Sequence, residues 1–169
     1  MRVYLVIMDE TDEASVALRF AARRASRTGG TVHLLALVPR QPFVAFGGIQ
    51  ATIEEEARAR AEALVTAAAG SLLGDSQRPP VISVQTGDGV DVIRAYLAEH
   101  PEVSALVLGA AASGGPGPLV SHFTAIAGQL ACPLYVVPGA MNDEALERLS
   151  WRRRPWWRIL PGRPRWPTR

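Results

Sequence analysis

The residues best suited to chemistry in this sequence form a glycine-rich loop between two apolar segments. Residues 110–118 carry three glycines and no charged side chain, and Gly109 stands directly before them. The apolar run that precedes the loop is typical of a strand, and residues 119–130 have the pattern of a helix. This arrangement exposes backbone N–H groups, because glycine allows close approach and the first turn of a helix leaves its donors unpaired. The loop is therefore a candidate anion site, with a flexible connector as the alternative.

Strand and helix patterns alternate regularly along the chain on both sides of this loop. Strand-like runs cover residues 3–8, 31–38, 81–86, 103–108 and 134–137. Four helical patterns lie between them: one from the acidic residues 9–13 to Gly29, one from a capping box at Thr52 and Glu55 to Leu72, and two over 90–99 and 119–130. The alternation predicts an α/β domain with a single open, mostly parallel five-stranded sheet and helices on both faces. Ligands in such folds bind beyond the carboxyl ends of the strands, where Asp9, Val38 and Gly109 are expected.

The charge of the chain is divided unevenly between a domain and a tail. Residues 1–150 hold eleven arginines and all sixteen acidic residues, a net charge of −5, whereas residues 151–169 hold seven arginines and no acidic residue, a net charge of +7. All four tryptophans also lie in this tail, together with prolines that prevent one long helix. We expect an α/β domain over 1–141, a short helical linker over 142–150 and a basic aromatic tail over 151–169, disordered or bound to a partner.

Several classes of chemistry lack their usual residues. His33, His100 and His122 are scattered and Cys132 is solitary, so no structural metal is expected. Ser121 and His122 are adjacent on a helix and point about 100° apart, so they cannot pair as nucleophile and base. The chain has no lysine, no P-loop and no dinucleotide fingerprint after its first strand. We therefore expect a protein that holds a ligand rather than an enzyme, with weak ATP hydrolysis left open.

Four segments together resemble the universal stress protein family. They are VIMDETDEASVALRFAARRA near the start, LALVP after the second strand, TGDGVDVIRAYLAEHPEVSALVLGAA in the middle and CPLYVVPG near residue 139. The resemblance covers residues 1 to about 141 in the family's order. It implies a sheet ordered 3-2-1-4-5, a cytoplasmic stress-linked role, dimerisation through the last strand and, in one branch, a bound adenine nucleotide.

The resemblance also assigns roles to particular residues. Asp9 matches the family's first-strand aspartate, Val38 a residue near the adenine, and Gly109 the first glycine of a phosphate signature that ends in a serine or threonine, here Ser121. The chain departs from that signature at Ala112 and Val120, which stand where the family has glycine. Gly115 and Gly117 are expected to supply the close backbone approach instead. The cofactor implied is ATP, with AMP or ADP as alternatives.

The same residues also fit purely structural roles, and these alternatives stay open. Asp9 could cap the first helix, Ser121 could be an N-cap, and Gly109 could serve a turn alone. The second functional hypothesis is accordingly a dimeric scaffold that binds no nucleotide and acts through its surface and tail. For the tail we expect an anionic membrane surface as partner, or single-stranded nucleic acid, because arginine and tryptophan suit both. A single cysteine and the absence of a signal peptide favour the cytoplasm.

Overall fold

A computed structural model describes residues 1–40, 47–72 and 78–150 of the chain. In chain order the elements are β1 (Val3–Met8), α1 (Asp12–Thr28), β2 (Thr31–Val38), α2 (Gly47–Leu72), β3 (Val81–Thr86), α3 (Gly89–Glu99), β4 (Val103–Ala110), α4 (Pro118–Ala125), a 3₁₀ turn (Ala127–Gln129), β5 (Leu134–Pro138) and α5 (Asp143–Ser150). The expected basic tail, residues 151–169, lies outside the described residues.

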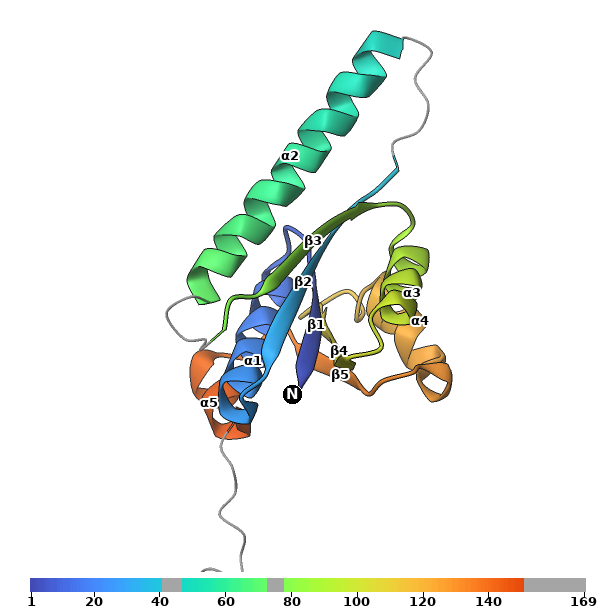
Figure 1. Ribbon diagram of the computed structural model, residues 1–169. Helices are drawn as coiled ribbons and strands as arrows, with labels where there is room; N and C mark the ends of the chain where they lie inside the picture. The colour runs from blue at the N-terminus through green and yellow to red at the C-terminus, as the bar shows by residue number, and fades with distance from the viewer. Residues whose placement is uncertain (41–46, 73–77, 151–169) are drawn as a thin grey trace, which may run out of the picture.

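The five strands form one parallel sheet in the order β3-β2-β1-β4-β5. This confirms the fold class that the sequence pattern predicted and the strand order that the family resemblance implied. β1 is the central strand, and all six of its residues are buried. Helices α1, α2 and α5 lie on one face of the sheet and α3 and α4 on the other, and the amino-terminal part of α2 extends beyond the sheet (Figure 1).

Alternate residues of β1 supply two separate cores. Tyr4, Val6 and Met8 face α1, α2 and α5 in one apolar cluster, while Val3, Leu5 and Ile7 face α3 and α4 in the other. This division follows from the two-residue period of a strand, whose successive side chains point to opposite faces. A continuous apolar run, rather than an alternating one, is what a strand covered on both sides requires.

The first helix begins after a side-chain cap and ends at a glycine. Thr11 is its N-cap, and the Thr11 hydroxyl accepts a hydrogen bond of 3.3 Å from the Ala14 backbone N–H. Gly29 ends the helix with φ +63°, a left-handed conformation that glycine adopts without strain. The alternative role considered for Asp9 was therefore wrong in detail: Asp9 does not cap the helix but accepts hydrogen bonds from the Thr11 backbone and hydroxyl.

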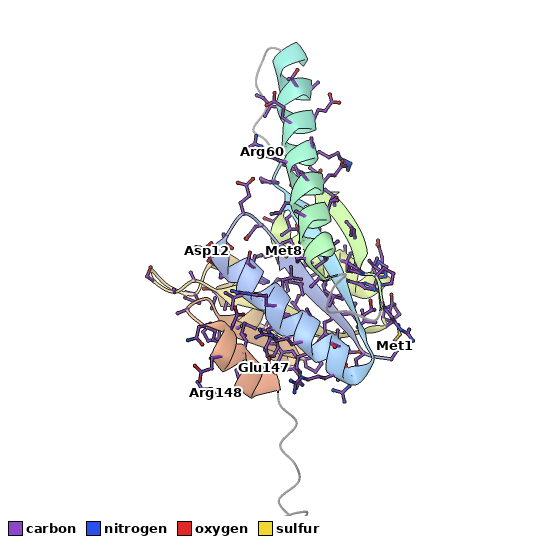
Figure 2. The ribbon with its side chains drawn as sticks, turned by 90° about the vertical axis from the view of Figure 1, so that its left-hand side faces the viewer. Met1, Met8, Asp12, Arg60, Glu147 and Arg148 are labelled. Carbon is purple, nitrogen blue, oxygen red and sulfur yellow. The ribbon has the colours of Figure 1, made fainter. Side chains whose placement is uncertain are left out.

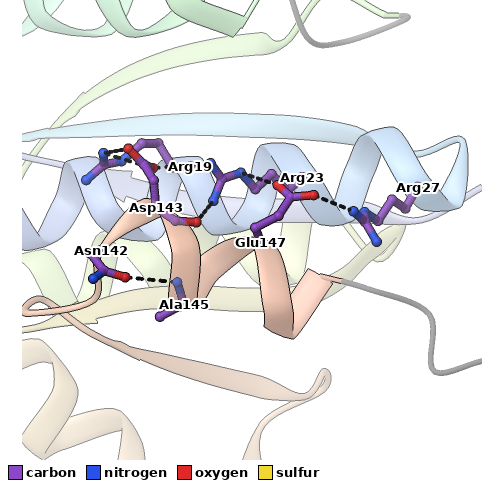
Figure 3. Close-up of polar contacts among 7 residues, drawn as sticks. All are labelled: Arg19, Arg23, Arg27, Asn142, Asp143, Ala145 and Glu147. Atoms are coloured by element: carbon purple, nitrogen blue, oxygen red, sulfur yellow. Dashed lines mark hydrogen bonds and ion pairs between the residues drawn. The ribbon is translucent and has the colours of Figure 1, made fainter.

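Residues 142–150, expected as a helical linker, form α5 and pack against α1. Asp143 pairs with Arg19 and Arg23, and Glu147 pairs with Arg23 and Arg27, so the acidic face of α5 follows an arginine stripe on α1 (Figure 3). These ion pairs are half-exposed, and each contributes little by itself. Leu146 between them is fully buried in the core with α1 and β1, which makes α5 part of the domain.

Three expected element boundaries differ from the structure by more than one residue. β4 continues through Gly109 to Ala110, because Gly109 pairs with Val137 of β5 and the pairing extends the strand. α2 begins at Gly47, so Thr52 lies inside the helix and is not its N-cap. The helix expected over 119–130 is divided into α4 and a 3₁₀ turn, with the break at Ile126.

The buried position of Leu146 gives a test of how α5 is attached. Leu146→Ala removes a fully buried side chain, and we expect it to lower the free energy of unfolding by about 2–5 kcal/mol. Arg148→Ala is the control, since it also truncates a side chain of α5 to alanine, but at an exposed position. Its effect should stay within about 0.5 kcal/mol. Equal denaturation midpoints for the two variants would contradict the packing described.

Candidate functional site

The carboxyl ends of β1, β2 and β4 meet at one edge of the sheet and border two cavities. Asp9, the residue directly after β1, lines both of them. One cavity lies between the ends of β1 and β4, the other between the ends of β1 and β2 beneath α2. The strand order reverses at β1, and this is where doubly wound folds bind their ligands.

The smaller cavity, of about 140 Å³, lies between β1, β4 and the start of α4. It is lined by Ile7, Asp9, Thr11, Glu13, Ala14, Leu108, Gly109, Pro116, Gly117, Pro118, Leu119 and Val120. Its floor is apolar, and its charged lining residues are the carboxylates of Asp9 and Glu13. Positive charge at this position must therefore come from backbone N–H groups or from an ion that accompanies the ligand.

The glycine-rich loop forms one wall of this cavity. Gly114, Gly115 and Gly117 all have positive φ, at +76°, +101° and +93°, and a Cβ on any of them would meet no atom within 4 Å. These glycines are therefore required by backbone conformation and not by crowding inside the protein. Gly117 is the N-cap of α4 without a side-chain cap, and Pro118 follows at the first helical position. The open loop and uncapped helix start leave the backbone accessible to a ligand.

The larger cavity, of about 430 Å³, falls within the range of small-molecule pockets. Its lining is Met8, Asp9, Glu10, Leu37, Val38, Pro39, Ile53, Ala57, Arg60, Ala61 and Leu64. α2 supplies the apolar wall opposite the strand ends. Arg60 is the basic residue of this lining; it lies on α2 on the same side as Asp12 at the start of α1 (Figure 2).

The structure brings most of the predicted site residues together. Asp9, Gly109, Gly117 and Val120 line the smaller cavity, and Val38 lines the larger one. Gly115 lies in the loop and Ser121 in α4, but neither lines either of these two cavities. Asp9 is therefore the residue that the two halves of the site share.

Gly109 and Ser121 do not have the structural roles that were considered for them. Gly109 is a strand residue and not a turn residue; a Cβ there would stand 2.2 Å from the Glu13 carbonyl oxygen, so glycine permits α1 to pack on β4. Ser121 is not an N-cap, because it is the fourth residue of α4 and its backbone N–H donates to the Gly117 carbonyl at 3.0 Å. The Ser121 side chain is exposed, whereas Val120 is buried in the core.

Residues of α1 and α2 in the lining were missed from the sequence. Thr11 and Glu13 enter the smaller cavity because the first turn of α1 lies against β4. Arg60 enters the larger one because α2 crosses the end of β2. The sequence around Arg60 gives no indication that this arginine borders a cavity.

The parallel sheet with helices on both faces and a strand order that reverses at β1 defines the doubly wound α/β class of folds. Within that class, the universal stress protein family matches residues 1–138, and the chain belongs to this family. The resemblance inferred from the sequence is thereby confirmed. A comparison of the sequence with curated proteins finds no match.

Solved structures agree on the fold at low sequence identity. The universal stress protein UspA from Lactobacillus plantarum is 20% identical with a TM-score of 0.69, covering 80% of this chain and 97% of its own. A universal stress protein family member from Burkholderia pseudomallei is 14% identical with a TM-score of 0.64, covering 80% and 95%. A universal stress protein in complex with cAMP is 14% identical with a TM-score of 0.58, covering 80% and 96%. Helices long and apolar enough to span a membrane are absent from the part of the chain that the structure describes.

Proposed function

We propose that this protein is a cytoplasmic regulatory module that binds an adenine nucleotide, ATP in the first instance and AMP or ADP as alternatives, at the carboxyl ends of β1 and β4. The observation that carries the proposal is the pair of cavities that meet at Asp9, one of them bordered by the open glycine loop. The universal stress protein solved with cAMP supports the same ligand class in a related fold.

The two cavities suit different parts of a nucleotide. The larger cavity has an apolar wall from α2 and Val38, which fits a flat purine ring, and its volume admits one. The smaller cavity and the loop at Gly114–Gly117 offer backbone N–H groups to the phosphates. In this proposal Asp9, which lines both cavities, accepts hydrogen bonds from the sugar hydroxyls.

The charges of the site favour binding of a nucleotide over its hydrolysis. No lysine exists in the chain to withdraw charge from a phosphate, and Asp9 and Glu13 oppose an approaching anion. Mg²⁺ bound to the nucleotide would offset those carboxylates. The proposed output is therefore a ligand-dependent state of the protein, and hydrolysis is not part of the proposal.

Substitution of Gly117 tests the phosphate half of the site. Gly117→Val places a branched side chain at φ +93° where phosphate must approach, and we expect ATP binding with Mg²⁺ to weaken tenfold or more, about 1.4 kcal/mol, by calorimetry. Gly29→Val is the matched control: Gly29 also has positive φ and open space, but it lies at the amino end of β2. It imposes a smaller backbone strain, at a left-handed position away from the site, and should leave affinity unchanged.

Two outcomes would count against the nucleotide site. If wild-type protein gives no heat with ATP, AMP or ADP at concentrations suited to micromolar binding, the dimeric scaffold becomes the better hypothesis. If both glycine variants lose affinity equally, the loss reflects strain in the fold and not contact with phosphate.

We also propose that the protein forms a homodimer through β5, as the family resemblance implies. β5 is an edge strand with its other side open in the described residues. Val136 and Leu149 are exposed there, beside a hollow of about 290 Å³ lined mainly by apolar side chains. The Leu106 backbone N–H donates to the Pro133 carbonyl, so by alternation the polar groups of Tyr135 face β4 and those of Val136 face the open edge. Such an edge is suited to pairing with a second copy.

A charge at the open edge tests this dimer. Val136→Asp places two like charges together in a two-fold interface, and we expect light scattering to report a shift from dimer to monomer. Ile82→Asp is the control, because Ile82 is similarly exposed, 45% against 39%, on the opposite edge strand β3. A wild-type monomer, or a dimer unaffected by Val136→Asp, would contradict the proposal.

For the tail we propose attachment to an anionic membrane surface. The support is its composition: four tryptophans suit the headgroup region, and each arginine near the surface contributes about 1 kcal/mol. Single-stranded nucleic acid is the competing partner.

Truncation after Ser150 separates these outcomes. The full chain should sediment with anionic but not neutral liposomes, lose this binding at high salt and show blue-shifted tryptophan emission, whereas the truncated chain should stay in solution. Binding to a single-stranded oligonucleotide but not to liposomes would favour nucleic acid. Identical behaviour of the two chains would remove any binding role from the tail.

A further inference from the structure

A second group of chemically active side chains lies near the amino ends of the strands, opposite the proposed nucleotide site. His33 is the third residue of β2, His100 is the C-cap of α3, and Glu102 directly precedes β4. One nitrogen or oxygen atom from each side chain lies within 4.8 Å of the other two. We propose that these three residues bind a divalent transition-metal ion, with Zn²⁺ the best match.

His33 has the surroundings of a metal ligand. Its side chain is buried, and its Nδ1 lies 3.0 Å from the hydroxyl of Tyr96, which is also buried. Metal-binding histidines usually have one ring nitrogen hydrogen-bonded in this way, which fixes the ring and leaves the other nitrogen for the metal. Burial, together with the neighbouring His100, lowers the pKa of His33, so the neutral form that binds metals is present at pH 7.

His100 and Glu102 supply the accessible half of the group. His100 Nδ1 lies 2.9 Å from Glu102 Oε1, and the His100 ring stacks on Tyr96 with 4.1 Å between ring centroids. A hydrogen bond to its own backbone N–H, and then the one to His100, lower the pKa of Glu102, which is a carboxylate at neutral pH. Both side chains reach solvent, at 33% and 50% exposure, which gives an ion a path of entry.

The donor set selects the kind of ion. Two imidazole nitrogens and one carboxylate oxygen suit Zn²⁺ or Co²⁺, whereas Mg²⁺ and Ca²⁺ prefer oxygen ligands alone. Ligand atoms around a tetrahedral Zn²⁺ are about 3.3 Å apart, given bonds of about 2.0–2.1 Å. The pair at 2.9 Å is already near this spacing, and the exposed Glu102 can move toward His33. The ion takes the place of the proton between His100 and Glu102, and its fourth position stays open to water.

The pairs His33–Tyr96 and His100–Glu102 also form a hydrogen-bonded network that needs no metal. Tyr96 satisfies His33, and Glu102 satisfies His100. The experiment must therefore distinguish a metal site from a structural network, and the chain offers a matched control for each kind of ligand.

Zn²⁺ titration of the untagged full-length protein, free of nucleotide, tests the proposal. We expect saturable one-to-one binding by calorimetry, and absorption bands of coordinated Co²⁺ when that ion replaces Zn²⁺. His100→Ala and Glu102→Gln should each weaken binding about tenfold or more. His122→Ala removes the histidine of α4, and Glu99→Gln neutralises an exposed carboxylate of α3; both should bind as the wild type does.

Proton competition provides a further readout. Binding should weaken as the pH is lowered, because protons compete with the ion for the imidazole nitrogens. No saturable Zn²⁺ binding by the wild type would overturn the proposal and leave a structural network. Equal losses in the ligand and control variants would overturn it too, since the ion would then bind elsewhere. Neither result bears on ATP affinity, which is measured at the opposite edge of the sheet.

Discussion

The burial of β1 on both faces is the constraint on which the rest of this structure depends. Each of its six side chains must be covered, and they alternate between two cores, so helices are required on both sides of the sheet. The chain meets this requirement by extending the sheet from β1 in both directions. The strand order therefore reverses at β1, and the crevice beyond its carboxyl end follows from the same packing that stabilises the domain.

Close packing of α1 on the sheet determines which residues line that crevice. Gly109 and Gly139 leave no room for a Cβ beside Glu13, so the first turn of α1 lies directly against β4 and β5. This contact brings Thr11 and Glu13 to the cavity together with Asp9. The result is a cavity lined by the carboxylates of Asp9 and Glu13, with a glycine loop of positive φ along one wall. The lining of this cavity includes no cationic side chain, so an anion there would depend on backbone N–H groups.

The opposite edge of the domain is assembled from different parts of the chain. The α3–β4 connection brings His100 and Glu102 toward a histidine of β2, and the Tyr96 ring contacts both histidine rings. On the other face, α5 closes the core through Leu146 and aligns its carboxylates with the arginines of α1. The domain thus has chemically distinct groups at both ends of its strands, held by one sheet.

The sequence by itself determined the class of fold, and most of its elements, because periodicity is a local property. The apolar runs at residues 3–8 and 31–38 are strands in the structure with those same bounds, and the family signature gave the strand order. Asp9, Gly109 and Gly117 were placed at one cavity because parallel strands end at the same edge. Tertiary structure alone decided that Gly109 continues a strand, that Arg60 borders a cavity and that α5 belongs to the core. It also brought His33 to His100 and Glu102, and His33 lies too far from those two residues in the sequence to suggest a cluster. Such contacts depend on how helices pack across the sheet, and local sequence patterns do not specify that packing.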